Sequence, residues 1–125
     1  MKKVTPQCGG ENNGHYTPGI ISGGLLYVSG QLSIDPDTRE VSHGGVTEHM
    51  ALALKNLERV LLEAGTSRDR VVHCRIYLSD IGGWDAANVV YSSFFGPHKP
   101  ARIVVPTGPL HFGCLVEIEA IAEVG

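Results

Sequence analysis

Hydrophobic positions follow two different periods along the chain, and the change of period separates the predicted helices from the predicted strands. From Val46 onward, apolar residues recur at steps of three and four, which is the spacing of one face of an α-helix. This stripe consists of Val46, Met50, Leu54, Leu57, Leu61 and Ala64. Because Gly65 suits the position just after a helix C-terminus, we predict a helix from Val46 to residue 64.

A second helix is predicted from Trp84 to Phe95, ended by Gly96-Pro97. Its expected core-facing residues are Trp84, Ala87, Tyr91, Phe94 and Phe95. Residues 71–78 instead alternate with a period of two, as a half-buried strand does. That alternation predicts a buried face formed by Val72, Cys74, Ile76 and Leu78.

Further strands are predicted at 19–21 and 25–29, joined by a glycine turn, and at 102–105 and 114–124. Residues 7–19, rich in Gly, Asn and Pro, read as a loop. The order of elements favours an α+β fold, with a single sheet and two helices packed on one face. We expect one domain over residues 1–125. Because the strands are so apolar, we expect the other face of the sheet to be buried as well, and self-association would bury it.

Composition narrows the classes of function. The chain is 42% hydrophobic and 18% charged, with a formal net charge of −3, so it offers no basic footprint for nucleic acid. No apolar stretch is long enough to cross a bilayer, and no apolar segment follows Lys2-Lys3 as in a signal peptide. Three cysteines at wide spacing, without CxxC, fit reduced thiols. These features predict a cytoplasmic protein with no membrane or nucleic-acid partner.

Common catalytic motifs are absent from the sequence: there is no GxGxxG, P-loop, HExxH or GxSxG. The six histidines show no ligand spacing, so we expect no metal and no other cofactor. The remaining candidates for a catalytic or binding role are polar residues within the predicted strands and at their ends.

Arg102 and Glu117 are the strongest candidates for chemistry. Arg102 directly precedes the apolar run Ile103-Val104-Val105. Its planar guanidinium would fit the carboxylate of a ligand. The alternative is that it forms an ion pair at the surface. Glu117 and Glu119 alternate on one strand face, roughly 6.5–7 Å apart. They could hold and polarise a water molecule, or simply lie on a solvated face.

Two further polar residues have an open role. Tyr16 lies in a predicted loop and could close a pocket or pack over the hairpin. Asn88 lies within the second helix, where asparagine gains nothing from helix propensity. It could face solvent or hydrogen-bond a neighbouring segment.

From about residue 14 to residue 124, the chain resembles the Rid/YjgF family, also called L-PSP endoribonucleases. The order and spacing of several segments together carry the resemblance. These segments are Tyr27-Val28-Ser29-Gly30-Gln31 with Asp35-Pro36, Asn56-Leu57 with Glu63-Ala64-Gly65, Asn88 with Tyr91, Phe94 and Phe95, Lys99-Pro100-Ala101-Arg102, and Val116-Glu117-Ile118-Glu119-Ala120-Ile121-Ala122.

The resemblance implies a chorismate-mutase-like fold that forms a homotrimer, with sites in the clefts between subunits. It further implies that Arg102 binds the substrate carboxylate and that Glu117 positions the attacking water. The remaining residues it assigns to the pocket are Tyr16 as a lid, Ser29 and Gly30 as lining, and Asn88. Many active members have serine and cysteine after the arginine, where this chain has Ile103 and Val104.

The expected reaction is hydrolytic deamination of reactive 2-imino or 2-enamino acids to 2-oxo acids and ammonia. The site must hold the carboxylate, aim one water and move protons. Backbone groups near Gly30 and Val104 would bind the developing ammonium. Two alternatives stay open. The first is a trimer that binds 2-oxo acids without turnover, because Ile103 and Val104 replace the serine and cysteine common in active members. The second is an endoribonuclease, which the net negative charge of the chain disfavours.

Overall fold

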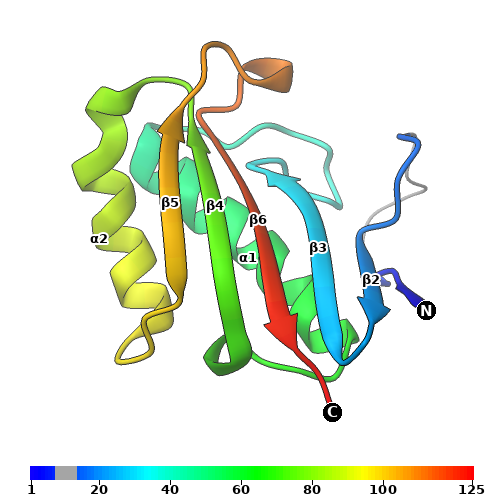
Figure 1. Ribbon diagram of the computed structural model, residues 1–125. Coiled ribbons are helices and arrows are strands. Elements are labelled where there is room, and N and C mark those ends of the chain that lie inside the picture. The colour runs from blue at the N-terminus through cyan, green and yellow to red at the C-terminus, as the bar shows by residue number, and fades with distance from the viewer. Residues whose placement is uncertain (8–13) are drawn as a thin grey trace.

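A computed structural model, which describes residues 1–7 and 14–125, contains a six-stranded sheet and two α-helices (Figure 1). The strands are β1 (Lys2–Val4), β2 (Gly19–Ser22), β3 (Leu25–Leu32), β4 (Val71–Leu78), β5 (Ala101–Pro106) and β6 (Val116–Glu123). The helices are α1 (Val46–Glu63) and α2 (Trp84–Phe95), and short 3-10 turns lie at Arg68–Arg70, Ile81–Gly83 and His111–Gly113.

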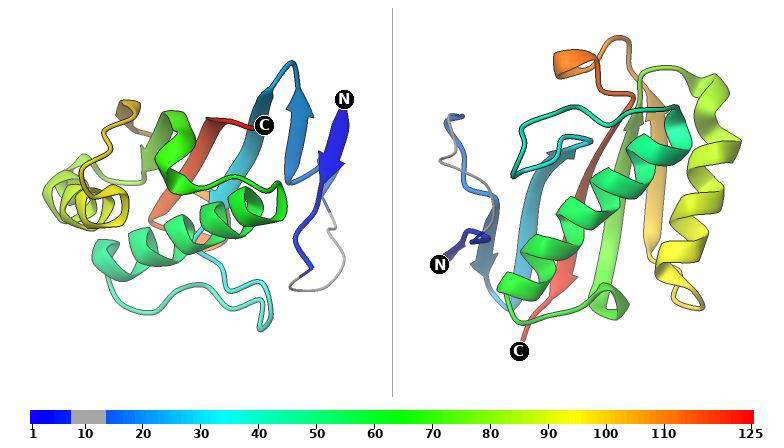
Figure 2. Two further views of the ribbon diagram at one scale, coloured as in Figure 1. Left: turned by 90° about the horizontal axis from the view of Figure 1, so that it is seen from below. Right: turned by 180° about the vertical axis from the view of Figure 1, so that it is seen from behind.

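The strands lie in the order β1-β2-β3-β6-β4-β5, and the β4–β5 pair is parallel whereas the others are antiparallel. Both helices pack on the same face of the sheet, as Figure 2 shows from below and from behind. The predicted α+β arrangement of one sheet with two helices on one face is therefore confirmed. β1 was not predicted, because three residues that include two lysines carry too little alternation to indicate a strand.

α1 begins and ends as the sequence predicts, to within one residue. The side chain of Glu48 accepts a hydrogen bond from the backbone N–H of Gly45 at 2.7 Å, which satisfies one of the unpaired donors at the helix start. Gly65 follows the helix with φ +79°, a backbone conformation that favours glycine. The apolar stripe of α1 therefore lies against the sheet over its whole length.

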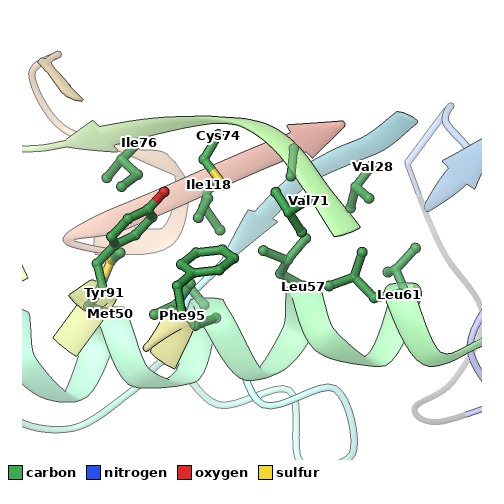
Figure 3. Packing of buried hydrophobic residues seen from close by; sticks show 14 of the residues in the cluster. Val28, Met50, Leu57, Leu61, Val71, Cys74, Ile76, Tyr91, Phe95 and Ile118 are labelled. Atoms are coloured by element: carbon green, nitrogen blue, oxygen red, sulfur yellow. The ribbon is translucent and has the colours of Figure 1, made fainter. Parts of the chain in front are cut away.

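The core lies between the helices and the sheet (Figure 3). Its fully buried side chains include Leu26, Met50, Leu54, Leu57, Leu61, Ile76, Leu78 and Ile118. From α2, Ala87, Tyr91 and Phe95 are buried and Phe94 is partly buried, as predicted. Trp84 is the exception, because it starts the helix at the sheet edge and remains 36% exposed.

The alternation of β4 is broken near its start, so one predicted core residue is wrong. Cys74, Ile76 and Leu78 are buried as expected, but Val72 is 45% exposed and Val71 takes the buried position. The pairing of β4 with β6 shifts register between Val71 and His73. Such an irregularity moves the residues before it to the opposite faces of the sheet.

We predict that a bulky thiol reagent will not label Cys74 in the folded protein. The Cys74 side chain is fully buried, and this burial raises the pKa of its thiol to about 11, so the reactive thiolate is scarce. Mass spectrometry of the labelled chain, before and after unfolding, measures the modification. Rapid native labelling of Cys74 would contradict its placement. Cys8 lies outside the described residues and must be scored separately.

Candidate active site

The predicted functional residues fall on opposite faces of the sheet. Arg102 of β5 is the register partner of Cys74, whose side chain points into the core beneath the helices. Glu117 of β6 is the partner of Tyr77, and Tyr77 alternates with the buried residues of β4. Since register partners project to the same side of a sheet, Arg102 lies on the helix side and Glu117 on the opposite side.

Four of the predicted residues line one wide groove, which the α1 residues Asn56, Arg59 and Val60 also line. Tyr16 comes from the segment before β2, Ser29 and Gly30 from the end of β3, and Glu117 from β6. Glu119, His111 and Phe112 also line this groove. Tyr16 is 55% exposed there, so its ring is available to a molecule bound in the groove.

An irregularity in β3 positions this part of the site. Val28 pairs with Ala120 and Gln31 with Ile118, so β3 carries one more residue than β6 across this stretch. Such a bulge changes the direction of nearby side chains and is common beside active sites. Ser29 uses it to hold the preceding loop: its Oγ donates to the carbonyl oxygen of Thr17 at 2.6 Å, and its N–H donates to that of Pro18 at 2.9 Å. Ser29 thereby fixes the loop that carries Tyr16.

Gly30 has a steric reason to be glycine. A Cβ atom at this position would lie 2.6 Å from Oε2 of Glu117, closer than real Cβ contacts allow. The missing side chain therefore leaves room for the Glu117 carboxylate directly beside the β3 backbone.

The two glutamates of β6 have different environments. Oε1 of Glu119 accepts hydrogen bonds from the Tyr77 hydroxyl at 2.6 Å and from Nη1 of Arg75 at 3.2 Å. Within residues 1–7 and 14–125, no donor hydrogen-bonds to the Glu117 carboxylate. Burial, and then the charge of Glu119, raise the pKa of Glu117, while the charge of His111 lowers it. Glu117 is thus the carboxylate suited to exchange protons nearer neutral pH.

Arg102 lies apart from this groove, beside the other two predicted residues, Asn88 and Val104. Nη1 of Arg102 donates to Oδ1 of Asn88 at 2.7 Å. The guanidinium carbon lies 4.7 Å from the ring centroid of Tyr91 and 5.5 Å from that of Trp84. These cation–π contacts and the hydrogen bond hold the guanidinium in one orientation at the sheet edge.

Arg102 and Glu117 of one chain cannot both contact the same small molecule. β4 lies between β5 and β6, which separates them by about 9–10 Å at the usual strand spacing. The two side chains also leave the sheet on opposite faces. Each chain therefore presents these residues as two separate groups.

Sequence reasoning missed the aromatic support of Arg102. Trp84 and Tyr91 were assigned to the core by their helical spacing, yet both rings also face the guanidinium. Trp84 and Tyr91 are seven residues apart, which places them on the same face of α2 as Asn88. This spacing was the available signal. It could be interpreted only once β5 was known to lie beside α2.

Two features of the described residues bear on cofactors and on membranes. Over residues 1–7 and 14–125, no cluster of three or more His, Cys, Asp or Glu side chains is arranged to hold a metal ion. In the same part of the chain, neither helix is long and apolar enough to span a bilayer.

Comparison with known proteins identifies the family. A sequence model described as Endoribonuclease L-PSP matches residues 10–124. A RutC family protein of Pyrococcus abyssi is 39% identical over 109 residues, which cover 87% of this chain and 86% of that protein. The chain belongs to the Rid/YjgF family.

Other Rid/YjgF relatives agree in sequence and in fold. A rat protein named 2-iminobutanoate/2-iminopropanoate deaminase is 37% identical over 112 residues, covering 90% of this chain and 82% of that protein. The crystal structure of a putative endoribonuclease from Thermotoga maritima superposes with a TM-score of 0.94 at 33% identity, covering 100% of this chain and 98% of that one. The resemblance read from the sequence is thus confirmed at the level of the family.

Proposed function

We propose that the protein hydrolyses 2-imino acids to 2-oxo acids and ammonia at sites shared between copies of the chain in a homotrimer. One copy supplies the groove with Glu117, and a neighbouring copy supplies the edge with Arg102. The observation that carries this proposal is the placement, on opposite faces of one sheet, of an oriented arginine and of a carboxylate of raised pKa to which no described residue donates a hydrogen bond. The name of the rat relative supplies the reaction class.

The Arg102 half-site suits a substrate carboxylate. Asn88 binds one edge of the guanidinium, and the rings of Tyr91 and Trp84 flank it. The remaining N–H donors can meet both oxygens of a carboxylate, the arrangement that favours arginine over lysine. Val104 adds an apolar wall beside it, against which the substrate's side chain can pack.

The Glu117 half-site suits the hydrolysis step. As water attacks the iminium carbon, its oxygen forms the new C–O bond and the C=N electron pair moves to nitrogen. The Glu117 carboxylate accepts the proton that the water releases, and then passes it to the amine nitrogen. The C–N bond breaks with its electron pair on nitrogen, and the hydroxyl loses a proton as the carbonyl forms. The raised pKa of Glu117 helps it to hold the proton between these steps.

The wild-type protein tests the proposal directly. We expect light scattering at micromolar concentration to give the mass of three chains, and an assay that generates imines in place from an amino-acid oxidase or dehydratase to show faster 2-oxo acid formation. Buffer and heat-unfolded protein serve as controls. A monomer would overturn the shared site. Binding of a 2-oxo acid without turnover would instead support a binding protein.

A further inference from the structure

The loop between β5 and β6 connects the strand of Arg102 to the strand of Glu117, and it carries His111 into the groove. Both ends of this loop are fixed. The N–H of Thr107 donates to the carbonyl oxygen of Leu78 at 2.8 Å. The N–H of Leu115 donates to Nδ1 of the buried His49 at 3.2 Å. Each end of the loop is therefore held by a hydrogen bond to a neighbouring element.

His111 is itself held within the loop. Its ring contacts that of Phe112, with the centroids 3.8 Å apart and the planes inclined by 53°. Phe112 has φ +61°, a conformation that costs energy for a bulky residue and that is found preferentially at functional sites. The Phe112 side chain is 66% exposed, so burial in the core does not explain this backbone geometry.

The groove contains other charged and titratable groups, which differ in their ability to exchange protons near neutral pH. Glu119 is engaged by Tyr77 and Arg75. The remaining charged or titratable side chains lining the groove are Tyr16, Arg39, Arg59, His111 and Glu117. Arginine does not lose its proton in the working range, and a tyrosine hydroxyl keeps its own near neutral pH. His111 is the only imidazole among the described residues that line the groove, and imidazole readily gives and takes protons at neutral pH.

We propose that His111 is a second catalytic residue, which accepts the hydroxyl proton when the tetrahedral intermediate collapses. This role deepens the proposed deamination and rests on it. It also explains how Glu117 can pass its proton to nitrogen without having to take another from oxygen in the same step.

The proton transfers balance with His111 starting as neutral imidazole. After water has added, the Glu117 carboxyl donates its proton to the amine nitrogen. The C–N bond then breaks with its electron pair on nitrogen, the hydroxyl oxygen forms the carbonyl double bond, and the imidazole takes the hydroxyl proton. The imidazolium finally gives that proton to the released ammonia, so an iminium ion and water become a 2-oxo acid and an ammonium ion.

The test compares His111→Gln and His111→Ala with wild type in the imine assay. We expect turnover to fall by about 10- to 100-fold in both variants, an effect that reaches only the lower end of the usual range for a positioned acid–base group. Binding of a 2-oxo acid should remain unchanged, and added imidazole should restore turnover of His111→Ala.

His43→Gln is the matched control, because His43 is an exposed histidine outside the groove that pairs with Glu40, at 3.8 Å. Its turnover and imidazole response should equal those of wild type. Full turnover in His111→Gln, or a loss in His111→Ala that imidazole does not restore, overturns the role of His111 alone. A wild-type protein without imine turnover overturns the deaminase proposal together with this one.

Discussion

Chains carrying Arg102→Ala and chains carrying Glu117→Gln, each almost inactive alone, should recover about a quarter of wild-type turnover when they are unfolded and reassembled together in equal amounts. Each proposed site needs Arg102 from one copy and Glu117 from its neighbour. In random mixed trimers, a given groove has an intact Glu117 in half of the cases, and the adjoining edge has an intact Arg102 in half of those. Turnover measured against the ratio of the two chains should peak at equal amounts.

Two controls separate this recovery from other causes. Mixing the folded variants without unfolding them shows how far chains exchange on their own. Reassembly of either variant with a chain that carries both substitutions should restore nothing, because no site then receives both intact residues. If the mixture of single variants stays inactive although mixed trimers form, Arg102 and Glu117 do not meet at one site.

Glu117→Gln alone should lower turnover by about 10²- to 10⁴-fold, the usual effect of losing a positioned general base. Glutamine keeps the size of the side chain beside Gly30 but cannot accept the proton of water. Binding of a 2-oxo acid, measured by calorimetry, should stay close to that of wild type. Because the pKa of Glu117 is raised, wild-type turnover should also decrease with falling pH from a value above that of an ordinary glutamate.

Arg102→Ala provides the contrasting control for this variant. It deletes a charge-assisted contact and should weaken 2-oxo acid binding by roughly 1.5–3 kcal/mol. Thermal melting of both variants checks that they remain folded. Unchanged turnover in Glu117→Gln would assign this carboxylate a structural role, and unchanged binding in Arg102→Ala would remove the proposed anchor.

The sequence was sufficient to predict elements whose periodicity is long and uninterrupted. The apolar stripe from Val46 to Leu61 specifies α1, and the helix occupies the predicted residues because packing and local signals agree. β4 shows the limit of this reasoning. A single irregularity in its pairing with β6 exchanges the faces of Val71 and Val72, and no local feature of the sequence marks that shift.

The candidate site was predictable as a set of residues but not as an arrangement. Alternation correctly places Glu117 and Glu119 on one face of β6. The relation of Arg102 to Glu117 depends on the sheet order and on the parallel register of β4 with β5, which are long-range properties. That no described residue donates a hydrogen bond to Glu117 likewise depends on Arg75 and Tyr77, which lie on another strand and engage Glu119 instead.

The described core is enclosed by one chain, with α1 and α2 covering one face of the sheet, whereas the proposed site requires two chains. In the proposed arrangement, folding and activity are therefore separable. A substitution that weakens only the contact between copies can leave a chain with native secondary structure and an intact core that has no catalytic function. Specific activity would then fall on dilution while the circular dichroism of each chain stayed constant, so that the concentration of the protein itself would determine how much of it works.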